Sequence, residues 1–196
     1  MLGRSFHMRP PVPEAVPEAV SQDLIPAWLN GRLVPMDKLA VHRRGLRHPA
    51  VSVFVLAGGE VLLQQRAATK YHTPGLWANT CCTHPHWQEP PDRTARRRLR
   101  EELGITGLYP VHADRLEYRA DVGGGLTEHE VVDVYLAYAE PGLALAPDPA
   151  EVAQVRWIGL YDLVAEVQRH PARFTPWLVL YMTRHIDRIF GTLPRS

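Results

Sequence analysis

Two neighbouring stretches decide how the chain is interpreted: WANTCCTHP (Trp77–Pro85) and RRLREELGI (Arg97–Ile105). In the first stretch a thiol and an imidazole are two residues apart. In the second, a pair of carboxylates closes a charged helical run. A soft nucleophile or base, a metal ligand and hard oxygen ligands are thus supplied within about one supersecondary unit. Few purely structural segments need all three, so the sequence predicts a chemically active site here.

The surrounding sequence predicts hairpins before this unit. Ile25–Leu29 and Arg32–Pro35 flank Asn30-Gly31, which is a strong hairpin signal. Ala50–Leu56 and Val61–Gln65 flank a pair of glycines and indicate a second hairpin. The run Ala50–Leu56 is apolar on both faces, which is typical of a central strand.

Helices and further strands are expected after it. Pro90-Pro91-Asp92 opens a helix that Gly104 closes. The remaining expected elements are strands at Leu116–Ala120, Glu130–Ala139 and Val155–Ile158, and helices at Tyr161–Arg169 and about Thr175–Phe190. Central strands with helices outside them predict an α/β fold, an α/β/α layered domain.

Composition bounds the possible functions. The 196 residues fit one domain, and 22 basic against 21 acidic residues leave a net charge of +1, which argues against a bulk nucleic-acid binder. No apolar run approaches the ~20 residues of a membrane helix, and no signal segment is visible. The two cysteines are adjacent and therefore poorly placed to pair, so we expect no disulfide and a cytoplasmic location.

The N-terminal segment differs from the rest. Residues 1–22 contain four prolines after position 9, with Pro-Glu-Ala-Val written twice. Such a segment has little to bury, so we expect a disordered Pro-rich extension at 1–22 and one ordered domain at 23–196.

Alternating carboxylates indicate a metal site. Glu128 and Glu130 point to one face of an expected strand, and His129 to the other. Such a pair needs a cation, a proton or open solvent, and an exposed strand end would explain it equally well. With His42, His48 and His84 near other predicted strands or turns, a site for Mn²⁺, Mg²⁺ or Zn²⁺ becomes the better interpretation.

The charged helix has its own pattern. Glu101 and Glu102 could simply form surface ion pairs with Arg97 and Arg98. Glu89, however, extends the pattern to Glu89-x7-Arg97-x-Leu99-x-Glu101-Glu102-x-Gly104-Ile105. This resembles the Nudix box, in which helix carboxylates hold a divalent metal against a diphosphate. Thr83 stands where the box begins with glycine and Arg98 where it has glutamate, and these departures argue against pyrophosphate hydrolysis.

Several other residues have both a structural and a functional interpretation. Cys82 could be an inert buried thiol, but beside His84 and a metal its thiolate would be more accessible. Solvated surface is the default for three basic residues, two after the second hairpin and one before His42, yet as a trio near a metal they would neutralise a diphosphate. Trp177 could belong to the core. The basic residues are Lys38, Arg66 and Lys70.

Taken together, these motifs resemble type I isopentenyl-diphosphate Δ-isomerase, a Nudix-superfamily enzyme, from about Ile25 to Phe190. The motifs are Gln64-Gln65-Arg66-Ala67, Pro74-Gly75-Leu76-Trp77, Asn79–Pro85, Tyr118-Arg119-Ala120, Glu128-His129-Glu130 and Pro176-Trp177. The resemblance implies a Nudix-type domain with a mixed central sheet. It also implies a small diphosphate substrate, isomerised through a tertiary carbocation, with neither nucleic acid nor membrane as partner.

Site residues follow from the same resemblance. It implies catalytic roles for Cys82, Glu130 and Tyr118, and it places Trp177 against the cation. A metal, Mn²⁺, Mg²⁺ or Zn²⁺, would be held by His42, His48, His84, Glu128 and Glu130. A substrate-linked Mg²⁺ would bind Glu102, and the diphosphate would contact Lys38, Arg66, Lys70 and Arg98.

Two alternatives remain. A Nudix hydrolase acting on a nucleoside diphosphate derivative predicts a full acidic box and no need for Cys82. A zinc-stabilised binding module would use Cys81, Cys82, His84 and His86, and it predicts closed tetrahedral coordination. Adjacent cysteines chelate one metal poorly, which ranks this module last.

Overall fold

A mixed sheet forms the centre of the molecule. The structure is a computed structural model, and it describes residues 24–191. The strand order is β5-β4-β3-β8-β7, with β6 also paired to β3 and β9 to β4. β3 and β8 run parallel, whereas β7 and β4 are antiparallel to their neighbours β8 and β3. The strands are β3 (His48–Ala57), β4 (Glu60–Arg66), β5 (Trp77–Ala78), β6 (Cys81–Thr83), β7 (Val111–Gly123), β8 (Leu126–Tyr138) and β9 (Val152–Gly159).

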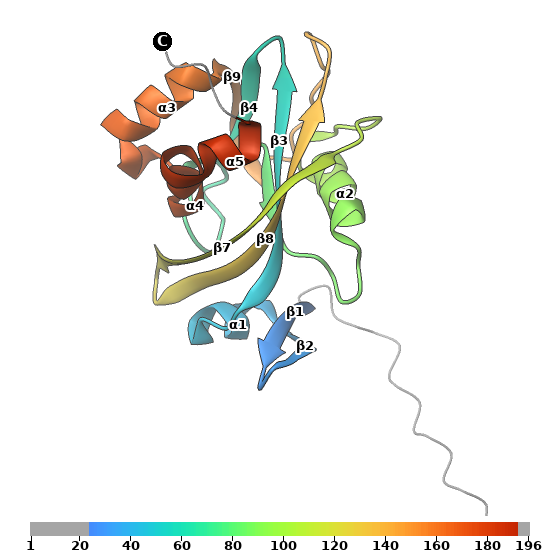
Figure 1. Cartoon of the computed structure of the whole chain (residues 1–196), viewed down its shortest axis with the longest axis vertical. Coiled ribbons are helices and arrows are strands. Elements are labelled where there is room, and N and C mark those ends of the chain that lie inside the picture. Colours follow the sequence, from blue (N-terminus) through green and yellow to red (C-terminus); the bar gives the residue numbers. More distant parts are fainter. Residues whose placement is uncertain (1–23, 192–196) are drawn as a thin grey trace, which may run out of the picture.

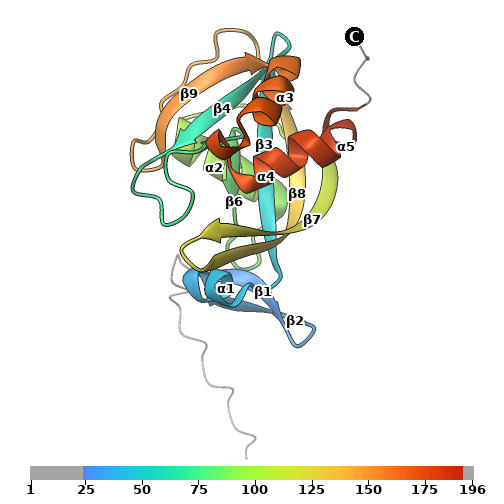
Figure 2. The same cartoon turned by 90° about the vertical axis from the view of Figure 1, so that its left-hand side faces the viewer.

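Helices cover both faces of this sheet (Figures 1 and 2). α2 (Pro91–Leu103) lies on one face, and α3 (Leu160–Arg169), α4 (Pro176–Leu180) and α5 (Ile186–Phe190) lie on the other. A π-helical turn at Tyr181–His185 joins α4 to α5. The predicted α/β/α layering is therefore confirmed. Within residues 24–191, no helix combines the length and the apolar character needed to cross a membrane.

The two faces of β3 explain why the sheet is covered twice. Alternate valines of Val51–Val55 pack with Ala95, Leu99 and Leu103 of α2. Phe54 points to the other face and packs in the cluster that contains α3, α4 and α5 side chains. Successive strand side chains alternate between faces, and each fully buried side chain of this size contributes roughly 1.5–3 kcal/mol. The strand predicted to be central is central.

A small hairpin and helix close one end of the sheet (Figure 1). β1 (Leu24–Leu29) pairs with β2 (Arg32–Asp37) through Asn30 and Gly31, whose φ angles of 50° and 77° match the predicted tight turn. α1 (Lys38–Arg44) follows, and the sequence pattern did not reveal it. The Asp37 side chain accepts a hydrogen bond from the Ala40 amide at 2.8 Å and starts the helix. Seven residues are too few for a clear helical period.

Candidate active and metal site

Strand register brings three functional side chains into one row. Glu130 on β8 lies opposite Tyr118 on β7 and opposite His48 on β3. The Tyr118 hydroxyl donates a hydrogen bond to Glu130 Oε2 at 2.6 Å. Glu128, two residues earlier on β8, shares this face. His129 points away, with its Nε2 3.3 Å from Oε1 of the exposed Glu117.

Three histidines from separate elements converge on Glu128. His42 comes from α1, His48 begins β3, and His84 follows β6. Their Nε2 atoms lie 3.4, 3.6 and 4.0 Å from Glu128 Oε2, and His84 Nε2 lies 3.0 Å from Glu130 Oε1. All five side chains are buried. The expected ligands are therefore brought together.

The donor set fits a divalent cation. His42 Nδ1 donates to the Lys38 carbonyl at 2.6 Å and His48 Nδ1 donates to the Leu46 carbonyl at 2.7 Å, so the Nε2 atom of each ring faces the cluster and becomes a lone-pair donor wherever it carries no proton. Glu128 Oε2 is buried without a hydrogen-bond partner among the described residues. Facing lone pairs and an unpaired buried oxygen are costly unless a cation lies between them. Backbone carbonyls that orient ligating imidazoles are a regular feature of metal sites.

The buried carboxyl groups of Glu128 and Glu130 have pKa values shifted in opposite directions. Burial and the neighbouring charge of Glu128 raise the pKa of Glu130 to about 8. Burial also opposes ionisation of Glu128, but the polar contacts that His42, His48 and His72 make with its two oxygens hold its pKa well below the usual range. In the metal-free protein at neutral pH, Glu130 therefore keeps a proton beside Tyr118, whereas Glu128 carries charge.

His48 also holds a proton in the metal-free protein. Burial lowers its pKa, but the nearby carboxylates of Glu128 and Glu130 outweigh burial and raise the pKa to about 9. This proton occupies a position that a metal would take, so metal binding has to release it.

The adjacent cysteines face opposite ways. Cys81 packs in the cluster under α2, with its Sγ 3.4 Å from Glu102 Oε1. Cys82 packs toward the other cluster and lines a cavity with Glu130. Burial and the charges of Glu130 and Glu128 raise the pKa of Cys82 well above its usual value. In the metal-free protein Cys82 is therefore a neutral thiol.

This cavity collects most of the predicted site residues. Tyr118, His42 and His48 do not line the cavity themselves but contact Glu130 or Glu128, which do. Glu102 does not line it, although its partner Arg98 does. The lining residues are Lys38, Arg66, Lys70, Tyr71, His72, Cys82, Thr83, His84, Arg98, Glu128, Glu130 and Trp177.

One wall of the cavity is cationic. Burial and the charge of Lys70 lower the pKa of Lys38 to about 8. Arg66 is 7% exposed, and its Nε is a buried donor without a partner among residues 24–191. Its guanidinium lies 5.4 Å from the centroid of the Trp177 ring. A buried, unpartnered guanidinium donor favours an anionic ligand.

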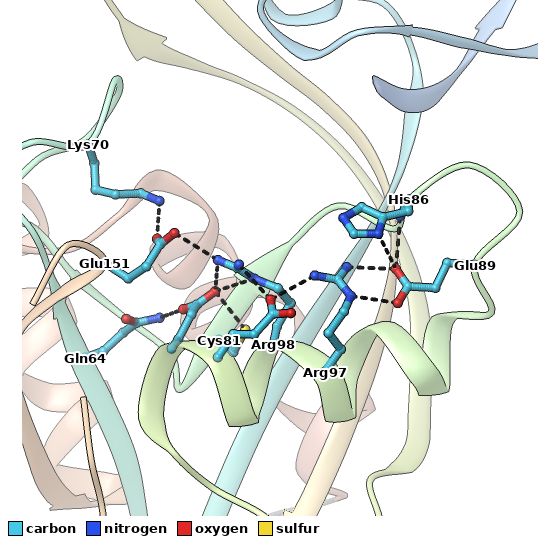
Figure 3. Close-up of polar contacts among 10 residues, drawn as sticks. Gln64, Lys70, Cys81, His86, Glu89, Arg97, Arg98 and Glu151 are labelled. Atoms are coloured by element: carbon cyan, nitrogen blue, oxygen red, sulfur yellow. Dashed lines mark hydrogen bonds and ion pairs between the residues drawn. The ribbon is translucent and has the colours of Figure 1, made fainter. Parts of the chain in front are cut away.

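Glu151 links the remaining two cations, as Figure 3 shows. Its carboxylate forms a short ion pair with Lys70 through Oε2, and Oε1 lies 3.3 Å from Arg98 Nη2. Arg98 Nη2 also lies 2.7 Å from Glu102 Oε1, and Gln64 donates to Glu102 Oε2 at 2.9 Å. In the free protein the acid expected to hold Mg²⁺ therefore pairs with Arg98.

The Glu89–Arg97 pair anchors the start of α2 (Figure 3). Arg97 donates twice to Glu89, from Nε and Nη2, each at 2.7 Å. Burial raises the pKa of Glu89, but the Arg97 hydrogen bond and the His86 amide outweigh it and lower the pKa to about 2. Glu101 forms the surface ion pair with Arg97 that was considered above, at 3.0 Å. The box thus fixes the loop after His84 against the helix.

Three site residues escaped sequence reasoning: Tyr71, His72 and Glu151. Tyr71 and His72 directly follow Lys70, and that adjacency was the available signal. Thr73, next to them, adopts a left-handed φ of 47°, which is uncommon for a β-branched residue and turns the segment back into the site. Glu151 lies in a loop far from Lys70 in sequence, and no pattern relates the two.

Solved structures share the fold. The chain superposes on a Deinococcus radiodurans protein with a TM-score of 0.64 and 15% identity, covering 82% of this chain and 97% of that one. A Nudix hydrolase from M. smegmatis gives a TM-score of 0.55 at 20% identity, covering 89% and 100%. At these identities the likeness concerns the fold alone.

Sequence comparison is more specific. A NUDIX domain model matches residues 46–178. A protein of Dinoroseobacter shibae named isopentenyl-diphosphate Delta-isomerase is 63% identical over 89% of this chain and 99% of its own length. Proteins with that name from Cereibacter sphaeroides and Ruegeria pomeroyi are 64% and 62% identical, over 87% and 86% of this chain and 97% and 93% of theirs. The chain therefore belongs to the isopentenyl-diphosphate Delta-isomerase family of enzymes, with a Nudix domain.

Proposed function

We propose that the protein interconverts isopentenyl diphosphate and dimethylallyl diphosphate, as in isoprenoid biosynthesis. The observation that carries this proposal is the buried Glu130 carboxyl, which lines the cavity and contacts the Tyr118 hydroxyl, as suits a group that transfers a proton to carbon. The thiol of Cys82 lines the same cavity. A hydrolase of the nucleoside diphosphate type has no use for this thiol.

The reaction needs two proton transfers. A proton is added to the terminal carbon of the unactivated alkene, which gives a tertiary carbocation, and a proton is lost from the carbon two positions away. No proton is consumed overall. Glu130, assisted by Tyr118, serves one face of the flat C5 group and Cys82 the other. The closed, buried setting keeps out water that would trap the cation.

Trp177 is assigned to the carbocation. The side chain is 2% exposed and its ring lines the cavity. A desolvated cation on an indole face gains about 2 kcal/mol or more. Because ~1.36 kcal/mol is a factor of ten in rate, the ring contributes over tenfold, and acid strength and positioning supply the larger remainder.

The diphosphate is assigned to the cationic wall. Lys38, Arg66, Lys70 and Arg98 all line the cavity. Arg66 offers its unpartnered Nε, whereas Lys70 and Arg98 have to exchange Glu151 for phosphate oxygens. A substrate-linked Mg²⁺ is assigned to Glu102, which likewise has to leave Arg98.

The histidine cluster is assigned to a resident metal. His42, His48, His84, Glu128 and Glu130 would hold Mn²⁺, Mg²⁺ or Zn²⁺. When bound, this cation would set the protonation state and orientation of the Glu130 carboxyl.

The test is purified protein with Mg²⁺ and isopentenyl diphosphate in deuterated water. NMR should show dimethylallyl diphosphate with deuterium in the newly formed methyl group and without phosphate release. Hydrolysis of nucleoside diphosphates in place of alkene isomerisation would instead favour the hydrolase alternative.

A further inference from the structure

A fourth histidine, His72, contacts the Glu128 oxygen that the other three histidines do not approach. His72 follows β4 in the Lys70–Thr73 turn and is 6% exposed. Its Nε2 lies 3.1 Å from Glu128 Oε1. The other three imidazoles all approach Oε2, the oxygen without a hydrogen-bond partner. The two oxygens of one carboxylate are thus divided between His72 and the metal-site histidines.

The surroundings of His72 fix which ring nitrogen carries the proton. Nδ1 lies 3.1 Å from the Thr73 hydroxyl, which is able to donate to it. Nε2 can then donate to the Glu128 carboxylate as a neutral N–H. Thr73 keeps its left-handed φ of 47° while making this contact, and backbone strain of this kind persists where surrounding contacts enforce it.

The same residue also contacts the substrate side of the cavity. Its ring meets the Trp177 ring edge-on, with centroids 5.9 Å apart. Its carbonyl accepts a hydrogen bond from Arg66 Nη2 at 3.2 Å. His72 therefore touches one residue from each of the three assigned groups: the metal ligands, the aromatic face and the cationic wall.

We propose that His72 is a positioning residue, which holds Glu128 Oε1 so that Oε2 is presented to the metal. This inference rests on the metal site proposed above. Partners that orient a ligating carboxylate are worth about 10- to 100-fold in metal affinity. Without the His72 donor, the Glu128 carboxylate loses the contact that fixes its orientation, and metal binding then has to order it at a cost in affinity.

Two substitutions of His72 distinguish the effect of its N–H donor from that of the volume of its ring. Gln in His72→Gln carries an amide N–H at nearly the reach of Nε2, whereas Met in His72→Met has similar length and no donor. The readout is Mn²⁺ affinity of the metal-stripped protein, measured by calorimetry, with circular dichroism to verify folding. His129→Met is the control, because His129 contacts the exposed Glu117.

We expect His72→Met to weaken Mn²⁺ binding by about 10- to 100-fold, and His72→Gln and His129→Met to stay within about fivefold of the wild type. Unchanged affinity in His72→Met, or equal loss in His72→Met and His72→Gln, overturns the inference. If His72→Met does not fold, Thr73→Val removes the hydroxyl that orients the ring. It should then weaken binding in the same direction, and unchanged affinity counts against the inference. Wild-type protein that binds no Mn²⁺ refutes the metal site itself.

Discussion

Removal of one hydroxyl tests the proposed proton-transfer group directly. In Tyr118→Phe, Glu130 Oε2 loses a hydrogen bond of 2.6 Å. Both residues are buried, so water does not readily replace the donor. Hydrogen bonds to charged groups contribute about 1.5–3 kcal/mol. If all of it is lost from the transition state, kcat falls by about 10- to 150-fold, because ~1.36 kcal/mol is tenfold.

The pH profile provides a second, independent signature. Tyr118 favours the ionised form of Glu130, so its loss should raise the Glu130 pKa above the value in the wild-type enzyme. The same 1.5–3 kcal/mol corresponds to about one to two pH units. The limb of the kcat–pH profile that reports Glu130 should therefore move to higher pH by about that amount.

The assay is NMR-monitored isomerisation between pH 5 and 10 with saturating substrate and Mg²⁺. Tyr135→Phe is the matched control, since Tyr135 lies on β8, the strand that carries Glu130, but packs in the cluster under α2. An unmoved limb and a kcat close to that of wild type in Tyr118→Phe would refute the assignment of Glu130 and its partner.

Three further predictions follow from the geometry. Cys82→Ala should abolish turnover while circular dichroism shows an intact fold, and Cys81→Ala should cost only packing; equal losses of activity would contradict the assignment. Phe keeps a weaker π face than Trp and Leu has none, so kcat should fall from wild type to Trp177→Phe and further to Trp177→Leu. Equal kcat values, with melting temperatures measured alongside, would mean that Trp177 only packs in the core. The metal-free protein should lose stability as pH rises from about 6.5 to 9, because folding raises the pKa of His48 from 6.5 to about 9 and that of Glu130 from 4.5 to about 8. A group whose pKa is raised on folding stabilises the folded state below its unfolded pKa and no longer does so above its folded pKa. A melting temperature that rises between pH 6.5 and 9 would contradict both assigned shifts.

Local chemistry explains how much of the fold was predictable. Asn30-Gly31 supplies two adjacent positive φ angles, and Gly104 ends α2 in a left-handed conformation, so these boundaries are fixed by single residues. The run Ala50–Leu56 is apolar at every position but one and had to be a strand covered on both faces. α1 lacked such a signal, because one capping carboxylate and seven residues do not make a period.

The candidate site divides in the same way. Alternation along β8 was enough to predict that Glu128 and Glu130 share a face and that His129 does not. The contacts of His72 and Glu151 depend instead on how a turn and a loop fold back on the sheet. Their partners are distant in sequence or lie on other elements, and no local pattern encodes such contacts.

The Glu151 carboxylate has a consequence for ligand discrimination. Glu151 already neutralises the charges of Lys70 and Arg98. An anion that binds these cations must displace Glu151, so its net gain is only the difference between its own interaction with them and that of Glu151. We expect a single phosphate or chloride to displace it poorly. A diphosphate that reaches Arg66 at the same time gains contacts that Glu151 does not offer. We therefore expect the Glu151 counter-ion to favour binding of ligands with two linked phosphates over binding of the simple anions of the surrounding solution.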